Sequence, residues 1–160
     1  MDLAGKTIVI TGGARGLGAA MAKRLAAAGC QLALVDLDEA ALESMAKECG
    51  EAGSPKVQGY IANVAKEEEV EALFDDIAGD FGAIHGLVNN AGIIRDALML
   101  KYKEGKQVSK MTLDQWQAVI DVNLTAVFLC GREAAAKMIE SGEKGCIINI
   151  SSISRSGNMG

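Results

Sequence analysis

The sequence predicts an α/β fold in which helices cover both faces of a doubly wound parallel sheet. Short apolar runs alternate with amphipathic helical stretches along the chain of 160 residues, which is the pattern of successive strand–helix–strand units. The connections are short except at residues 90–111, and glycines mark the point where the first apolar run passes into the first helix. Right-handed crossovers of this kind place the strands parallel in one sheet.

Five apolar runs are expected to form the strands, and four stretches with helical periodicity are expected to form the helices. The strands are predicted at residues 7–11, 31–36, 56–62, 84–89 and 145–151, and the helices at residues 16–28, 38–50, 66–81 and 112–141. Gly29 suits the left-handed position that follows the first helix. Asp38 is expected to cap the second helix, and Thr112 with Gln115 forms a capping-box pattern at the start of the fourth.

The fourth helix and the connection before it stand apart from the rest of the pattern. The helix carries apolar side chains on more than one face, so we expect it to contribute to a subunit interface of a homo-oligomer, a dimer or a tetramer. Residues 90–111 are expected to form one long, lysine-rich, irregular connection. Long connections in compact domains are often functional.

The composition is that of one ordinary globular domain, with 49% hydrophobic and 23% charged residues. A net charge of −5 argues against nucleic acid as a main partner, because phosphate binding needs a basic face. No apolar run approaches the length of about 18 residues that a spanning helix needs, and the first six residues lack the apolar core of a signal peptide. We therefore expect a cytoplasmic protein without a membrane partner.

Cysteine and histidine usage gives no indication of a metal site. Cys30, Cys49, Cys130 and Cys146 are scattered without a close pair and are interpreted as reduced packing residues. His85 is the single histidine and has no partner at ligand spacing, so it is expected to begin a strand.

A glycine-rich turn at residues 11–18 is the strongest functional signal in the chain. A side chain at Gly12 would block the tight turn, and one at Gly16 or Gly18 would keep main-chain amides or the helix away from a ligand. The helix that follows would direct its N-terminus at a pyrophosphate. Such turns also occur for packing alone, but Asp36 ends the next apolar run 18 residues beyond Gly18, where a carboxylate can accept both hydroxyls of an adenosine ribose.

Four motifs in order resemble the short-chain dehydrogenase/reductase family along the whole chain. They are the turn at residues 11–18, the Asn-Asn-Ala-Gly sequence at residues 89–92, Asn123 in the fourth helix, and the Ile-Asn-Ile-Ser-Ser sequence at residues 148–152. The resemblance implies a Rossmann-type sheet whose first five strands have the order 3-2-1-4-5. It also implies hydride transfer between NAD(P)(H) and a ketone or secondary alcohol, as in 3-oxoacyl-acyl-carrier-protein reductases and ketone, sterol or polyol dehydrogenases.

The resemblance also assigns roles to individual residues. Ser152 matches the serine that hydrogen-bonds the substrate oxygen, and Asn123 matches the asparagine that holds a water of the proton relay; without the family pattern they would be a strand-end hydroxyl and a polar helix residue. Asn63 stands where the family usually has an aspartate that contacts the adenine amino group. The residues expected to bind the cofactor are Gly12, Arg15, Gly16, Leu17, Gly18, Asp36, Asn63, Val64, Asn90, Ala91, Gly92 and Ile150. Asp36 favours NAD(H), whereas Arg15 favours NADP(H), and we give more weight to the ribose contact of Asp36.

The family's active-site tyrosine and lysine, four residues apart, are expected beyond Ser152 and do not occur there in this sequence. Tyr102 and Lys106 have the right spacing, but they precede the helix of Asn123, and Gly105 weakens the helical turn that would align them. We therefore interpret residues 1–160 as the N-terminal, dinucleotide-binding part of a longer dehydrogenase, and expect no turnover from them alone.

Other functions remain open at this point. A non-catalytic NAD(H)-binding regulator would need no proton relay, so Ser152 and Asn123 count against it, and a sugar-nucleotide epimerase fits the sequence at residues 89–92 less well. The substrate is expected to be a small ketone or alcohol, or an acyl group on a carrier. Lys101, Lys103, Lys106 and Lys110 could steer an acidic carrier toward the site, although a solvated loop explains them as well.

Overall fold

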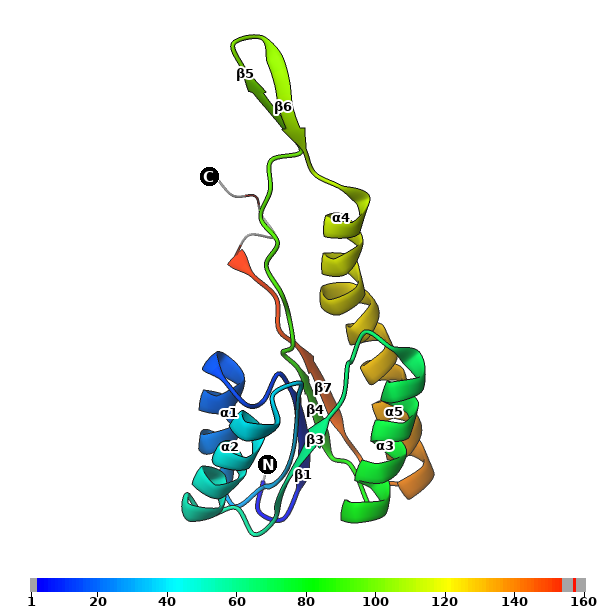
Figure 1. The fold of residues 1–160 in the computed structure, drawn as a ribbon. Helices are drawn as coiled ribbons and strands as arrows, with labels where there is room; N and C mark the ends of the chain where they lie inside the picture. The colour runs from blue at the N-terminus through cyan, green and yellow to red at the C-terminus, as the bar shows by residue number, and fades with distance from the viewer. Residues whose placement is uncertain (1–2, 154–156, 158–160) are drawn as a thin grey trace.

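A parallel sheet of five strands lies at the centre of the computed structural model, which describes residues 3–153 and 157 (Figure 1). The strands are β1 (Thr7–Thr11), β2 (Gln31–Asp36), β3 (Val57–Ile61), β4 (Gly86–Asn89) and β7 (Cys146–Asn149), in the order β3-β2-β1-β4-β7. All four neighbouring pairs are parallel. The predicted sheet and its order are confirmed, because β7 is the fifth of the predicted strands.

The predicted strands are slightly too long at several ends. The strand predicted from residue 84 begins at Gly86, because the ladder with β1 pairs only Gly86 to Val88 with Ile8 to Ile10. Ile84 is nevertheless fully buried. His85 therefore precedes β4 and does not begin it.

Two helices cover each face of the sheet. On one side lie α1 (Gly16–Ala26) and α2 (Glu39–Glu51), and on the other lie α3 (Glu67–Phe81) and α5 (Ala126–Ser141) (Figure 1). The first helix ends two residues before its predicted end, and Gly29 has the left-handed conformation expected after it, with φ of 75°. Asp38 caps α2 as predicted, since its side chain accepts a hydrogen bond from the Ala41 amide.

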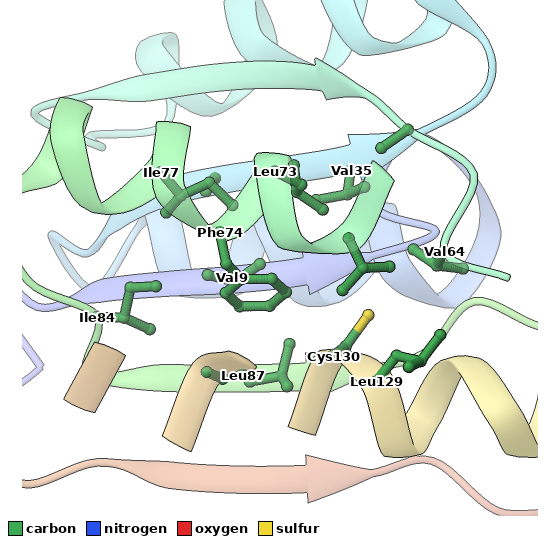
Figure 2. Packing of buried hydrophobic residues seen from close by; sticks show 14 of the residues in the cluster. Val9, Val35, Val64, Leu73, Phe74, Ile77, Ile84, Leu87, Leu129 and Cys130 are labelled. Carbon is green, nitrogen blue, oxygen red and sulfur yellow. The ribbon is translucent and has the colours of Figure 1, made fainter. Parts of the chain in front are cut away.

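The alternation of side chains along β1 explains the two cores. Ile8 and Ile10 face α1 and α2, whereas Val9 faces α3 and α5. Figure 2 shows the second core, in which Phe74 and Leu87 are fully buried between the sheet and the two helices. This packing fixes the sheet whose carboxyl edge carries the candidate site.

The cysteines behave as packing residues, with one exception. Cys30, Cys49 and Cys130 are buried free thiols, and burial raises the pKa of Cys130 to about 12. Cys146 is a free thiol on the exposed strand β7.

The predicted fourth helix is continuous but contains a π-helical turn. It consists of α4 (Leu113–Ile120), η1 (Asp121–Thr125) and α5, and Thr112 with Gln115 forms the predicted capping box. A single π turn in an α-helix often marks a functional position. Here that turn contains Asn123.

The expectation of one irregular connection over residues 90–111 is wrong. The chain forms an antiparallel hairpin of β5 (Leu100–Lys103) and β6 (Lys106–Lys110), which projects away from the sheet beyond α4 (Figure 1). Glu104 and Gly105 both have positive φ, of 51° and 76°, as a two-residue hairpin turn requires. The closely spaced lysines leave no apolar alternation from which strands could be predicted. Tyr102 and Val108, which favour strands, and the Glu-Gly turn between them are the features that indicate a hairpin.

None of the helices that the structure describes has the length and apolar composition required to cross a bilayer.

Candidate functional site

A cleft of about 450 Å³ lies at the carboxyl ends of β1, β2 and β4. Its lining comprises Gly12, Arg15, Gly16, Leu17, Val35, Asp36, Leu37, Ala62, Asn63, Val64, Asn90, Ala91, Gly92, Ile93 and Val122. Of the residues predicted to bind a cofactor, all but Gly18 and Ile150 line this cleft. In open α/β sheets, ligands bind at this edge, beside the strand where the order reverses.

Three of the four glycines in the turn, Gly12, Gly16 and Gly18, are required for different physical reasons. Gly12 and Gly16 have φ of 63° and 53°, a conformation that disfavours any side chain. A Cβ at Gly12 would lie 3.0 Å from Ala91 Cα, whereas one at Gly16 would meet nothing within 4 Å. Gly16 therefore opens onto the free space of the cleft.

Gly18 does not line the cleft because it is a packing residue. A Cβ there would overlap the carbonyl oxygen of Gly12 and approach the Asn90 side chain to 2.8 Å. The absence of a side chain at Gly18 lets α1 begin directly against the turn. Arg15 is the N-cap of α1 and provides no side-chain cap, so the first amides of the helix receive no capping hydrogen bond from it.

The carboxylate of Asp36 is held in place by main-chain amides. Its Oδ2 accepts a hydrogen bond from Ala14 N at 3.3 Å, and its Oδ1 accepts two, from Leu37 N at 2.8 Å and from Asp38 N at 3.4 Å. These contacts fix both oxygens at the end of β2, beside the glycine turn. A carboxylate has about four acceptor positions, so after these three amides acceptor capacity for a ligand remains on Oδ2.

Arg15 lies at the same end of the cleft and is paired with Asp38. Its guanidinium donates a hydrogen bond to Asp38 Oδ2, and the arginine side chain remains 69% exposed. Local sequence patterns do not indicate this pair, because the two residues are 23 positions apart. The pair offsets the charge of Arg15, although Asp38 itself does not line the cleft.

Thr11 is a site residue that the sequence analysis did not single out. Its buried hydroxyl oxygen accepts hydrogen bonds from Asn90 N and Ala91 N, both at 3.0 Å. In return, Asn90 Nδ2 donates to Thr11 O at 3.0 Å and to Gly12 O at 3.1 Å. These contacts join the end of β1 to the end of β4, and so hold two walls of the cleft together.

Asn63 lies at the end of the cleft that follows β3. Its Oδ1 accepts a hydrogen bond from Ala65 N at 3.1 Å, and its main-chain N–H donates to Glu69 Oε2 at 2.7 Å. The side chain that was expected to meet adenine thus also shapes the loop before α3.

Asn123 reaches the cleft from the π turn and binds the main chain of Ile93. Its Oδ1 accepts from Ile93 N at 2.8 Å, and its Nδ2 donates to Ile93 O at 2.9 Å. This reciprocal pair ties residues 90–93 to the long helix. Ile93 therefore lines the cleft, although its apolar side chain does not predict a place in the site.

Ser152 and Ile150 follow β7, outside the cleft. Ile150 donates its amide to Asn89 O at 2.9 Å, which places this segment next to the end of β4. Ser152 is exposed. Tyr102 and Lys106 lie in the projecting hairpin, where neither lines the cleft.

Residues 6–159 match the family model described as short chain dehydrogenase. The chain belongs to this family. The resemblance that the four motifs indicated is thereby confirmed, and the family consists of oxidoreductases that act on CH-OH groups.

Curated relatives of this short-chain dehydrogenase carry names for different substrates. The 3beta-hydroxysteroid dehydrogenase 1 of Eggerthella lenta is 39% identical over 95% of this chain and 55% of its own length. The 3-oxoacyl-[acyl-carrier-protein] reductase FabG of Thermotoga maritima is 36% identical over 96% of this chain and 58% of its own length. The chain thus spans a little over half the length of these relatives.

Solved structures of similar proteins contain either nicotinamide cofactor. An NAD+-bound xylitol dehydrogenase has a TM-score of 0.85 at 30% identity, covering 99% of this chain and 57% of its own. A metagenomic short-chain oxidoreductase in complex with NADP has a TM-score of 0.83 at 30% identity, covering 99% of this chain and 67% of its own.

Proposed function

We propose that the protein is an NAD(H)-dependent oxidoreductase that interconverts a ketone and a secondary alcohol, and that residues 1–160 form its dinucleotide-binding part. The observation that carries the proposal is the combination, in one cleft, of an open glycine turn at a helix N-terminus and the carboxylate of Asp36. The bound cofactor would supply the hydride, while the protein supplies alignment and proton handling.

The glycine turn supports a diphosphate site. The first amides of α1 have no side-chain cap, and the free space at Gly16 allows a ligand to approach the main chain closely. A helix N-terminus favours negative charge through its unpaired donors and its dipole. Asn90, Ala91 and Gly92 would form the wall against which the adenosine half of the ligand lies.

The ribose end supports NAD(H) over NADP(H). Main-chain amides hold the Asp36 carboxylate at this end of the cleft with acceptor capacity left for the ribose, and its negative charge would repel a 2'-phosphate. Arg15 could attract that phosphate, but its guanidinium is already paired with the Asp38 carboxylate.

Asn123 and Ser152 are the chain's own candidates for handling the reacting oxygen. We assign Ser152 to a hydrogen bond with the substrate oxygen, where it would stabilise developing negative charge. Asn123 uses both the oxygen and the nitrogen of its side-chain amide to bind the main chain of Ile93. We therefore propose that the π turn around Asn123, and not its side-chain amide, positions the water of the proton relay. A non-catalytic NAD(H)-binding regulator is the second candidate, because the bond between Asn123 and Ile93 would serve it equally well.

We also propose that the long helix forms a subunit interface. Leu113, Trp116, Leu124 and Phe128 expose between 56% and 75% of their surface along α4, η1 and α5. An apolar stripe of this extent on a helix is typical of association.

Calorimetric titration of NADH and NADPH tests the cofactor assignment. We expect NADH to bind at least about tenfold more tightly, since charged hydrogen bonds contribute about 1.5–3 kcal/mol. Asp36→Asn should remove most of this preference. Glu43→Gln removes the same charge from α2 outside the cleft and should leave the preference unchanged. Tighter binding of NADPH by the unmodified chain would overturn the assignment.

Turnover by the complete gene product separates the enzyme from the regulator. NADH oxidation that depends on an added ketone supports the enzyme. Cofactor binding without turnover of any ketone or alcohol tested would select the regulator.

A further inference from the structure

Asn63 is the polar side chain of the cleft that remains available to a base. The lining that the structure describes contains four polar side chains, those of Arg15, Asp36, Asn63 and Asn90. Arg15 is paired with Asp38, and Asn90 donates hydrogen bonds into the glycine turn. Asp36 is assigned to the ribose, so Asn63 is left to contact the edge of the base that this ribose carries.

The order of the strands places Asn63 at the base end of the cleft. The glycine turn follows β1, Asp36 ends β2, and Asn63 comes two residues after β3, and these three strands are neighbours in the sheet. Two hydrogen bonds join their ends, from Gly13 N to Val35 O at 3.1 Å and from Ala62 N to Asp36 O at 3.4 Å. A dinucleotide with its diphosphate on the turn and its ribose at Asp36 would therefore bring its base to Asn63.

The contacts of Asn63 fix which end of its side-chain amide is free. Oδ1 accepts a hydrogen bond from Ala65 N at 3.1 Å, and a main-chain N–H can only donate, so the oxygen and not the nitrogen faces it. The main chain is held as well, because Asn63 O accepts from Lys66 N at 2.9 Å and Asn63 N donates to Glu69 Oε2 at 2.7 Å. The hydrogen bond from Asn63 N is also the main cause that lowers the pKa of Glu69. The side-chain nitrogen Nδ2 is the end that is left over.

This nitrogen is an accessible hydrogen-bond donor. Among residues 3–153 and 157, no group accepts a hydrogen bond from Asn63 Nδ2, and no buried side-chain nitrogen or oxygen is left without a partner. It follows that Nδ2 is open to solvent, in a residue that lines the cleft. Oδ1 also retains one of its two acceptor positions. Asn63 can therefore offer either a donor or an acceptor to a base.

A donor and an acceptor together make the side chain indifferent to the group at position 6 of a purine. Adenine has an amino group there, which donates, and hypoxanthine has an oxygen, which accepts, while N7 is an acceptor in both. Asn63 can accept from the amino group through Oδ1 or donate to the oxygen through Nδ2. An aspartate at this position would only accept, so it would bind the amino group and repel the oxygen.

We propose that Asn63 makes the cofactor site tolerant of the base, so that a dinucleotide with hypoxanthine in place of adenine binds almost as well as NADH. The inference rests on the proposed binding of NAD(H). Leu37 and Val64, which line the same cleft, have apolar side chains that can pack against a purine ring but do not distinguish its substituents. Asn63 is thereby the residue that sets base selectivity.

Calorimetric titration of the complete gene product with NADH and with reduced nicotinamide hypoxanthine dinucleotide tests the inference. We expect the two dissociation constants to differ by less than about threefold in the unmodified protein. Asn63→Asp keeps the size of the side chain and its acceptor for Ala65 N. It should raise the preference for NADH to about tenfold or more, since a hydrogen bond to a charged group is the stronger kind. The control Gln107→Glu adds the same charge in the exposed hairpin and should leave the ratio unchanged.

Three results would overturn the inference. They are a ratio above about threefold in the unmodified protein, an Asn63→Asp protein with an unchanged ratio, and a Gln107→Glu protein whose ratio changes as much as that of Asn63→Asp. Each ratio compares two ligands of the same protein, so a general loss of stability in a variant does not alter it. If Asn63→Asp does not fold, the ratio in the unmodified protein decides alone.

The same titrations distinguish failure of this inference from failure of the proposed function. If NADH binds and the hypoxanthine dinucleotide does not, the site selects adenine and the inference fails, while the proposed cofactor stands. If neither dinucleotide binds, the proposed function fails, and the inference fails with it.

Discussion

Replacing Thr11 by valine should weaken the junction between β1 and β4 that forms two walls of the cleft. Valine has nearly the shape of threonine but lacks the hydroxyl oxygen that accepts hydrogen bonds from Asn90 N and Ala91 N. The side chain is 2% exposed, so water cannot readily replace that oxygen. Two main-chain donors would then lie unsatisfied at the junction of β1 and β4.

The expected magnitude follows from those two donors. An unsatisfied buried donor costs about 1–3 kcal/mol, so Thr11→Val should lower the free energy of unfolding by about 2–4 kcal/mol after partial relaxation. Thr11→Ser keeps the oxygen and removes one methyl group, which corresponds to about 0.8 kcal/mol. The affinity for NADH should fall in the valine variant as well, because Asn90 and Ala91 line the cleft.

Urea unfolding followed by circular dichroism measures the first effect, and calorimetric titration with NADH measures the second. The decisive quantity is the difference in stability between the valine and serine variants. If the two variants unfold within about 0.5 kcal/mol of each other, the hydroxyl does not hold the two strands together and the reasoning is refuted.

Two further predictions concern the glycine turn and the histidine. Gly18→Ala should destabilise the chain by about 1–3 kcal/mol in urea unfolding, because its Cβ would overlap Gly12 O; Gly79→Ala, at an open helical position, should instead stabilise it by up to about 1 kcal/mol. Equal effects of the two alanines would contradict the packing role of Gly18. Burial is the main cause that lowers the pKa of His85; the charge of Lys6 adds to the shift, and Glu143 opposes it. The folded state therefore favours the neutral imidazole, whose Nδ1 accepts a hydrogen bond from the Thr7 amide. The stability that this provides is present above the ordinary pKa of 6.5 and is lost as pH falls through the lowered pKa, by at most about 1.4 kcal/mol per pH unit. His85→Asn keeps an acceptor but does not titrate, so its stability should depend less on pH in that range; an unchanged pH profile would exclude His85 as the source.

Much of the fold could be predicted because the local signals agree with one another. Continuous apolar runs define the buried strands, Asp38 and Thr112 act as helix caps, and Gly29 takes the left-handed conformation. The elements that escaped prediction lack such agreement. The hairpin is dense in lysine and has no buried face, so its strand pattern carries no hydrophobic alternation.

The candidate site was only partly predictable for a related reason. Residues that leave space or carry charge in a fixed motif, such as Gly16 and Asp36, can be recognised by their spacing. Contacts between distant segments cannot, because nothing in the local sequence of Thr11 indicates that it accepts amides from a strand 79 positions away. The π turn at Asn123 is equally invisible, since its residues have ordinary helical periodicity.

A crystal structure with NAD+ tests the central claim most directly, because it locates the ligand against named atoms. The account predicts that the diphosphate lies on the main-chain amides at the start of α1 and that both hydroxyls of the adenosine ribose bind Asp36. A dinucleotide bound away from the carboxyl end of β1, or with its ribose out of reach of Asp36, would contradict it.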